Sequence, residues 1–457
     1  MDDKDVIIQR LTEQVKTLLA EIVRLNAEIA RLKKNSSNSS KPPSSDIVKP
    51  PPPNPRRKGK RKRGGQFGHR KCVRPVFPPE QVDKVIEHEL KDAAGLRPLN
   101  QWRVVQQIEL LDRPFVIVEH RARRYRCTRT GQIITAPLPP EVARAGLLGP
   151  RLSALVAYQK GACHMSYATI ATFLRDVLGV SLSTGQLAKV VAKAGAALAG
   201  AYEQLAAALP DQPRLGVDET GHKDNGSAYW TWCFRAKDFT LYKIDPSRGS
   251  DVLREVLGEA FGGVLGCDYF SAYRKYMAEA GATVQFCLAH LIREVRFLAE
   301  QADAVLSRWA GKLLKHLRRL FGTLHRRTKT PAERFARAMG RIRRAFLRQV
   351  SRPPDRREAR TLAERFRRHG TSYFTFLTTG GVAPTNNLTE QAIRFVVIDR
   401  KVTQGTRGSV GQRWCERVWT LLATCAQQGR SAFAFLVDSL AAHFRRRPPP
   451  SLLPANL

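Results

Sequence analysis

A seven-residue repeat of apolar side chains opens the chain and restricts residues 1–34 to one regular structure, an amphipathic helix. β-branched residues occupy one position of the repeat and leucines the position three residues later: Ile8, Val15, Ile22 and Ile29, with Leu11, Leu18, Leu25 and Leu32. This combination favours a parallel two-stranded coiled coil, and a helix packed on its own chain is the alternative. We therefore expect residues 1–34 to be a coiled-coil dimerisation helix through which the chain forms a homo-oligomer.

Residues 35–66 have a different composition. Ser, Asn and Pro dominate the first part, which cannot bury apolar surface and is expected to be a disordered linker. The linker ends in a basic run of seven cations within eight residues: Arg56, Arg57, Lys58, Lys60, Arg61, Lys62 and Arg63. Such runs bind phosphate backbones without reading sequence, although a solvated linker is the alternative. We interpret this run as a nucleic-acid contact.

The excess of positive charge extends to the whole chain. Its 457 residues contain 77 Lys and Arg against 40 Asp and Glu, a formal net charge of +37, which argues for nucleic acid or an anionic membrane as partner. No apolar run approaches the ~18 residues of a membrane span, so we expect no membrane partner. Eight cysteines lie singly along the chain, a pattern that fits free thiols in the cytoplasm.

Residues 67–145 are expected to form a small β-rich module, with strand-like runs at 103–110 and 115–120. Cys72, His88, His120 and Cys127 suggest zinc, but none of them belongs to a Cys-x-x-Cys pair. Structural zinc sites usually contain such pairs, so we expect no zinc in this module.

Two helices joined by a short Gly-containing turn are predicted within residues 146–205. This is the outline of a helix-turn-helix DNA-binding region, and many helical hairpins that do not bind DNA share it. From spacing alone both interpretations remain open.

Short strands begin at Leu215. Three of them, at 215–218, 230–235 and 239–244, are followed by helix, strand, helix and strand as far as residue 287. This order predicts a mixed sheet of the ribonuclease H-like kind at 206–300, within a multidomain α+β chain.

The remaining sequence is predicted to be mainly helical. Residues 301–370 contain 21 Lys and Arg against five Asp and Glu, and we interpret them as a basic helical insertion. Residues 371–430 are expected to complete the core, with Asn386 capping a helix that carries Glu390. Residues 431–457 are expected to be a C-terminal tail.

Two acids follow short apolar strands of the predicted sheet, Asp218 and Asp268. If those strands are adjacent, the carboxylates lie side by side and repel each other unless a cation lies between them. Oxygen ligands alone select Mg²⁺ or Mn²⁺ over zinc, and Glu390 is the best-placed third ligand for two such ions. Glu219 is a rival ligand, and each acid taken singly fits a turn or cap residue.

Several short sequence blocks, taken in the order in which they occur along the chain, resemble transposases of the insertion-sequence-66 family, which are DDE enzymes with a ribonuclease H-like core. The resemblance covers nearly the whole chain. Besides the heptad repeat of residues 1–34, the blocks lie at 35–44, 64–69, 217–221 (Val-Asp-Glu-Thr-Gly), 268–273 (Asp-Tyr-Phe-Ser-Ala-Tyr), 287–290 (Cys-Leu-Ala-His), 386–394 (Asn-Asn-Leu-Thr-Glu-Gln-Ala-Ile-Arg), 400–401 and 450–454.

The resemblance implies that Asp218, Asp268 and Glu390 are the catalytic triad and hold two Mg²⁺ or Mn²⁺ ions. Arg394 lies one turn after Glu390 and can reach a phosphate near the metals, or else pairs with Glu390. Lys401 is expected to contact phosphate as well. Family members usually carry paired cysteines ahead of the helix-turn-helix, but only Cys127 is present here, which again argues against zinc.

The sequence therefore predicts a transposase that cleaves double-stranded donor DNA at the ends of an insertion element. The freed 3′-hydroxyl is then joined to target DNA by two-metal in-line chemistry, in the bacterial cytoplasm and in association with the nucleoid. The alternative is a catalytically decayed, oligomeric DNA-binding protein. An RNA-processing nuclease of the same fold is a third hypothesis, for which we find no RNA-binding pattern.

Overall fold

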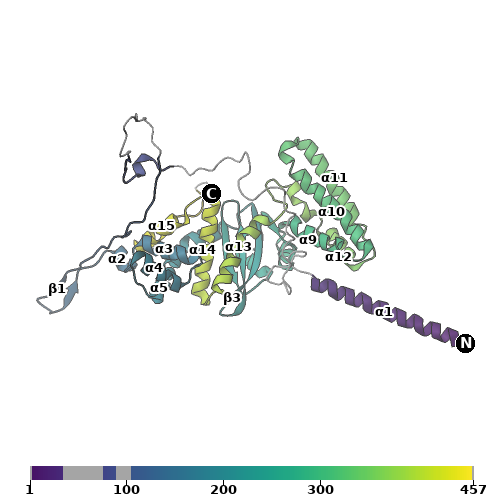
Figure 1. Ribbon diagram of the computed structural model, residues 1–457, viewed down its shortest axis with the longest axis horizontal. Helices are drawn as coiled ribbons and strands as arrows, with labels where there is room; N and C mark the ends of the chain where they lie inside the picture. The colour runs from purple at the N-terminus through teal and green to yellow at the C-terminus, as the bar shows by residue number, and fades with distance from the viewer. Residues whose placement is uncertain (1–2, 34–75, 89–103, 455–457) are drawn as a thin grey trace, which may run out of the picture. The chain divides into compact units, whose positions relative to one another are not determined.

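The computed structural model, which describes residues 3–33, 76–88 and 104–454, contains a five-stranded mixed sheet (Figure 1). Its strands are β3 (Arg214–Asp224), β4 (Ser227–Arg235), β5 (Thr240–Asp245), β6 (Val264–Cys267) and β7 (Thr283–Phe286). The spatial order is β5-β4-β3-β6-β7, with antiparallel pairing among β3, β4 and β5. Strands β6 and β7 run parallel to β3. The predicted α+β class with a mixed sheet is confirmed.

Strand β3 is longer than the sequence predicts. We expected it to end at Asp218, but it continues to Asp224, which pairs with Ser227 of β4. The turn between them is Asn225-Gly226, and both residues have positive φ, 47° and 84°. Asn-Gly is the preferred sequence for a two-residue hairpin turn, so this dipeptide was the signal for the longer strand.

Helix α14 (Gly408–Gln428) covers the outer edge of the sheet. Alternate residues of edge strand β5 donate their backbone N–H groups to side chains spaced four residues apart on α14. The pairs are Thr240 with Thr424, Tyr242 with Thr420 and Ile244 with Glu416. An edge strand covered in this way cannot pair with another chain.

Helix α13 (Asn387–Thr403) packs directly on β3. Gly216 permits this approach, because a Cβ atom at that position would lie 2.2 Å from Thr389 Oγ1. Asn386 occupies the N-cap position, but its side chain does not cap the helix, contrary to the prediction. Its Nδ2 donates instead to the carbonyl of Val217 at 2.8 Å, which joins the start of α13 to the strand.

A layer of helices precedes the sheet in sequence: α2 (Pro140–Ala145), α3 (Pro150–Gly161), α4 (Tyr167–Leu178), α5 (Thr184–Ala197) and α6 (Ala199–Ala207). Between α4 and α5 the chain turns at Gly179, whose φ is 67°. A capping box formed by Ser183 and Gln186 then starts α5. Helix α15 (Ala432–Phe444) lies in the range expected to be a tail, and it packs against α3.

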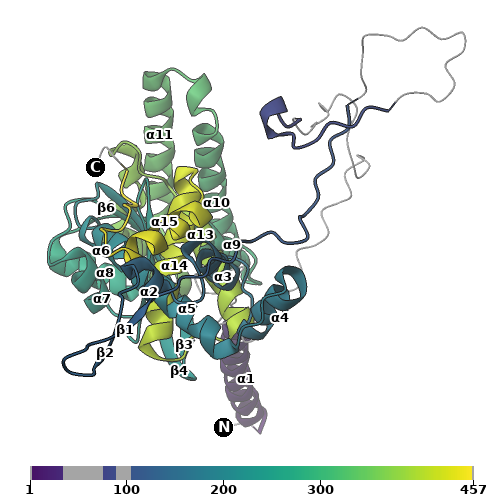
Figure 2. The same cartoon turned by 90° about the vertical axis from the view of Figure 1, so that its left-hand side faces the viewer.

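The other helices lie between and after the strands. They are α7 (Ser250–Leu257), α8 (Ser271–Ala280), α9 (Leu288–Ala299), α10 (Ala304–Leu324), α11 (Ala332–Val350) and α12 (Arg357–His369). The last three confirm that residues 301–370 are helical. Figure 2 shows α10 and α11 side by side and standing out from the sheet.

The remaining described segments contain little regular structure. Residues 104–120, in which we expected two strands, form none, so this prediction is wrong. Their apolar residues, such as Val105 and Val116, are exposed and pair with no strand among the described residues, and an unpaired strand is not stable. Two short strands, β1 (Arg124–Arg126) and β2 (Ile133–Thr135), form a hairpin. The described residues between 51 and 121 belong to a unit separate from the one that contains the sheet.

Residues 3–33 form helix α1, as the heptad repeat predicts, and the apolar heptad positions whose side chains are described are exposed. The basic run at 56–63 and Cys72 lie outside the described residues. Among the helices that the structure describes, none is long and apolar enough to cross a membrane.

Replacing Gly216 with Ala tests the contact between α13 and β3. Because the new Cβ collides with Thr389, we expect the free energy of unfolding to fall by about 1–3 kcal/mol. Gly266→Ala is the matched control. Gly266 lies on β6 opposite Gly216, and a Cβ atom at Gly266 would be 3.6 Å from the nearest atom. Denaturant unfolding measures both variants, and equal stability would contradict the close packing.

Candidate functional site

Asp218 lies on strand β3, and Asp268 directly follows the neighbouring parallel strand β6. The register pairs Gly216 of β3 with Gly266 of β6, and each acid comes two residues after its paired glycine in sequence. Strand β6 ends at Cys267, and the Asp268 carboxylate accepts a hydrogen bond of 2.8 Å from the backbone N–H of Phe270. The sheet therefore brings these two acids together.

The two carboxyl groups have strongly perturbed acidity. Burial raises the pKa of Asp218 well above its usual range, and the negative charges of Glu219, Asp268 and Glu390 raise it further. Burial, followed by the charge of Glu219, raises the pKa of Asp268 to about 7. A divalent cation bound beside carboxyl groups that resist ionisation in this way would remove the repulsion between their negative charges.

Glu219, the rival ligand, already has partners. Its Oε1 accepts hydrogen bonds from Nε and a terminal nitrogen of Arg248, at 3.0 and 2.6 Å, and its other oxygen accepts a short bond from the Tyr273 hydroxyl. The carboxylate is buried. A carboxylate held by a guanidinium and a phenol has fewer free lone pairs for a metal than Asp218 has.

Glu390 lies in the first turn of α13 and comes from a third element of the fold. Its Oε1 is 3.3 Å from a terminal nitrogen of Arg293 and 3.6 Å from Nδ1 of His290. Its negative charge acts on Asp218. Among the described residues, the charged partner of Glu390 is therefore Arg293 on α9, and Arg394 does not pair with it.

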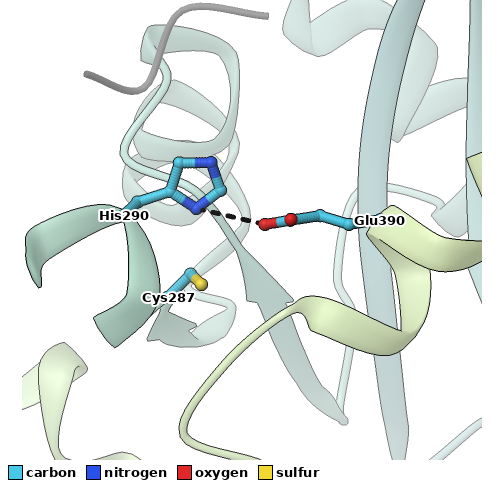
Figure 3. A group of neighbouring side chains, drawn as sticks. All are labelled: Cys287, His290 and Glu390. Atoms are coloured by element: carbon cyan, nitrogen blue, oxygen red, sulfur yellow. Dashed lines mark ion pairs between the residues drawn. The ribbon is translucent and has the colours of Figure 1, made fainter. Parts of the chain in front are cut away.

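Cys287, His290 and Glu390 form a second group that could hold a metal (Figure 3). Their sulfur, nitrogen and oxygen ligand atoms lie within 4.8 Å of one another, and this mixed set suits zinc better than Mg²⁺. However, the Arg293 guanidinium contacts the same Glu390 oxygen. Burial also raises the pKa of the Cys287 thiol, whose sulfur accepts a hydrogen bond from the backbone of Asn386.

His290 is uncharged at neutral pH. Burial, and then the nearby charge of Arg293, lower its pKa to about 3. Its Nδ1 is buried and has no hydrogen-bond partner among the described residues. A neutral imidazole can therefore face Glu390 without forming an ion pair with it.

Comparisons with known proteins identify the family. A family model described as "Transposase IS66 family" matches residues 145–413, which is more than half of the chain and includes all three acids. The chain belongs to the IS66 transposase family. A second model, a family of unknown function (DUF6444), matches residues 2–75.

Two relatives from Sinorhizobium fredii are similar over most of the chain. The uncharacterized proteins y4qI and y4hP are each 24% identical to it, over 394 and 374 residues. The alignments cover 79% and 74% of this chain, and 72% and 67% of the two relatives. Membership of a transposase family implies DNA transposition and DNA as partner.

Three cations of this transposase lie on α13. Arg394 and Lys401 are both exposed, and their spacing from Glu390, four and eleven residues, puts them on the same helix face. Arg400, which sequence reasoning did not select, points to β3 and donates to Thr220 Oγ1 at 3.1 Å. Arg293 was also missed, because its partner Glu390 is 97 residues away in sequence.

The acidity of Asp268 predicts how stability depends on pH. In the unfolded chain its pKa is ~4, so between pH 4 and pH 7 the folded transposase binds more protons than the unfolded chain. Stability therefore falls as the pH rises through this range. We expect the melting temperature to be lower at pH 8 than at pH 5, and Asp268→Asn to reduce this difference.

Mg²⁺ should act in the opposite direction, because it favours the ionised carboxylates. We expect it to raise the melting temperature more at pH 8 than at pH 5. Asp211→Asn, which changes an exposed acid, is the control and should melt as the wild type does. An unchanged pH dependence in Asp268→Asn would contradict the assigned acidity.

Proposed function

We propose that the chain is a DDE-type transposase that cleaves donor DNA at the ends of an insertion element and joins the 3′-hydroxyl to target DNA. Asp218, Asp268 and Glu390 are its catalytic triad. The observation that carries this proposal is that the charges of Asp268, after β6, and Glu390, on α13, act on the half-buried Asp218 carboxyl.

The order of the strands supports the same proposal. Three antiparallel strands followed by two parallel ones, in the order β5-β4-β3-β6-β7, correspond to a ribonuclease H-like core. In this arrangement Asp218 lies on the first strand in sequence and Asp268 follows the fourth. Glu390 comes from α13, after a helical insertion of α10 to α12.

The oxygen donors of this triad fit Mg²⁺ or Mn²⁺, and two such ions would activate a water or 3′-hydroxyl and stabilise the leaving oxygen. Asp218 and Asp268 would hold ions between the strands, and Glu390 would complete the ligand set. Arg394 and Lys401, exposed on the same face of α13 as Glu390, would hold the phosphates of the DNA. Glu219 keeps Arg248 and Tyr273 in place beside the site.

Asp218→Asn is the direct test of the triad. Asparagine is almost the same size but carries no charge, so with Mg²⁺ and DNA carrying the element ends we expect nicked and joined products to fall to the level seen without metal. Gel analysis measures the nicked and the joined products, with Asp211→Asn as the control for loss of an exposed acid. Undiminished cleavage by Asp218→Asn would overturn the assignment.

Cys287→Ser separates the two possible metal sites. Serine can still accept the hydrogen bond from Asn386 but is a poor zinc ligand, so we expect Mg²⁺-dependent cleavage to persist. Loss of cleavage together with loss of bound zinc, measured by metal analysis, would instead favour a site at Cys287, His290 and Glu390.

DNA reading is assigned to α4 and α5. A turn at Gly179 joins them, and the first residues of α5, including Thr184 and Gln186, are exposed. Such a start of a second helix can enter the major groove. The basic run at 56–63 would add contacts that do not depend on the DNA sequence. If the wild type and Asp218→Asn bind DNA equally and neither cleaves it, the alternative of a decayed DNA-binding protein is favoured.

We also assign oligomerisation to a parallel coiled coil of α1. Seven heptad positions between Ile8 and Ile29 are 46–62% exposed in the single chain, and a partner helix would cover them. We expect Leu18→Lys to shift the full-length chain to a smaller species in light scattering, because Leu18 is a heptad core position. Leu19→Lys, the same change one residue outside the core, is the control; equal behaviour of both would contradict the coiled coil.

A further inference from the structure

Helix α11 carries a straight row of exposed arginines, which we call the α11 arginine row. Its members are Arg334, Arg337, Arg341, Arg344 and Arg348. Their spacing alternates between three and four residues, which keeps all five on one face of the helix. The opposite face holds Met339, Phe346 and Val350, which are 1–2% exposed. The row therefore faces solvent, directly away from the packed side of the helix.

The charge of the row is hardly compensated within the chain. Glu333 is the only acidic residue of α11, and its ion pair with Arg337 is 3.7 Å long between two exposed side chains. Such a pair contributes little to stability. The other four arginines form no ion pair with any residue that the structure describes. Because like charges three and four residues apart repel, folding does not account for the row.

The dimensions of the row match a nucleic-acid backbone. From Arg334 to Arg348 there are 14 steps, or about 21 Å at the helical rise per residue. Duplex DNA places about six base pairs in this length. All five residues are arginines, whose planar guanidinium binds phosphate oxygens in pairs, rather than lysines.

Helix α10 carries a second row of cations with the same spacing. Its members are Arg308, Lys312, Lys315 and Arg319, all exposed. The two helices pack together as a hairpin, and Figure 2 shows this hairpin standing out from the five-stranded sheet. A polyanion held there would contact the chain away from the reacting phosphate.

An anionic membrane fits α11 less well than DNA does. A helix that lies on a membrane inserts an apolar face beside its basic one. The apolar face of α11 is buried inside the helical hairpin, where Met339 and Phe346 are each 1% exposed. Only the charged face is available, so the partner must be recognised by charge alone.

We infer that the α11 arginine row binds the phosphate backbone of duplex DNA flanking the cleaved end, without reading its sequence. The inference rests on the proposed function, because it takes the DNA substrate of a transposase as the ligand. It adds a contact surface outside the catalytic centre, which lengthens the DNA that one chain holds.

The test is a triple variant, Arg341→Gln, Arg344→Gln and Arg348→Gln, in the full-length chain. Binding to a long duplex and to one truncated at the cleavage site is measured without divalent metal over a range of salt. We expect the triple variant to bind the long duplex at least about tenfold more weakly at 0.1 M salt. The salt dependence of log K should become shallower by about 2.7, which is 0.9 for each lost phosphate contact.

A matched control removes the same number of positive charges from residues outside α11. Lys237→Gln, Arg254→Gln and Lys275→Gln remove three surface cations that already pair with acids, and this variant should bind as the wild type does. Equal affinity and salt dependence of the two triple variants would overturn the inference. So would a loss confined to anionic lipid vesicles with DNA binding unchanged.

This experiment separates the inference from the proposed function. Binding is measured without metal, so the result stands even if the wild type cleaves no DNA. Conversely, Asp218→Asn can abolish cleavage while the row variant binds DNA normally, and then only the inference about α11 fails. Thermal unfolding of both triple variants verifies that they are folded.

Discussion

The contact of helix α13 with strand β3 is the constraint on which the candidate site depends. At one end Gly216 leaves room for Thr389, and Asn386 donates to the carbonyl of Val217. At the other end Thr406, just after the helix, exchanges backbone hydrogen bonds with the Asn225 N–H and the Lys223 carbonyl. Because both ends are held, Glu390 stays close enough to Asp218 for its charge to act there.

The strongly positive chain contains an acidic centre, and local pairing explains how both coexist. Residues 211–300 contain 11 Lys and Arg against 13 Asp and Glu, although the whole chain has a net charge of +37. Arg248 neutralises Glu219, and Arg293 contacts Glu390. Asp218 and Asp268 have no such partner of opposite charge in direct contact among the described residues, and their raised pKa values follow from burial and from nearby negative charges, that of Glu219 first.

Local patterns predicted most helices and the strands of the sheet, and they failed where the outcome depended on a distant partner. The runs at 104–120 were predicted to be strands, but they pair with no strand in the part of the chain that the structure describes. Strand β3 was predicted too short, although Asn225-Gly226 signals the hairpin. Asn386 was correctly placed at the start of α13, but its side chain bonds to Val217, 169 residues away. No local pattern reveals such a partner.

The sequence by itself determined the heptad helix, the basic segments and the α+β class, because these follow from periodicity and composition within short windows. It also indicated Asp218, Asp268 and Glu390 as candidate residues, through a resemblance of ordered motifs. Only the tertiary structure decided which acids share one environment and which are already paired. That decision depends on the register between β3 and β6 and on the close approach of α13, which join residues 50 and more positions apart.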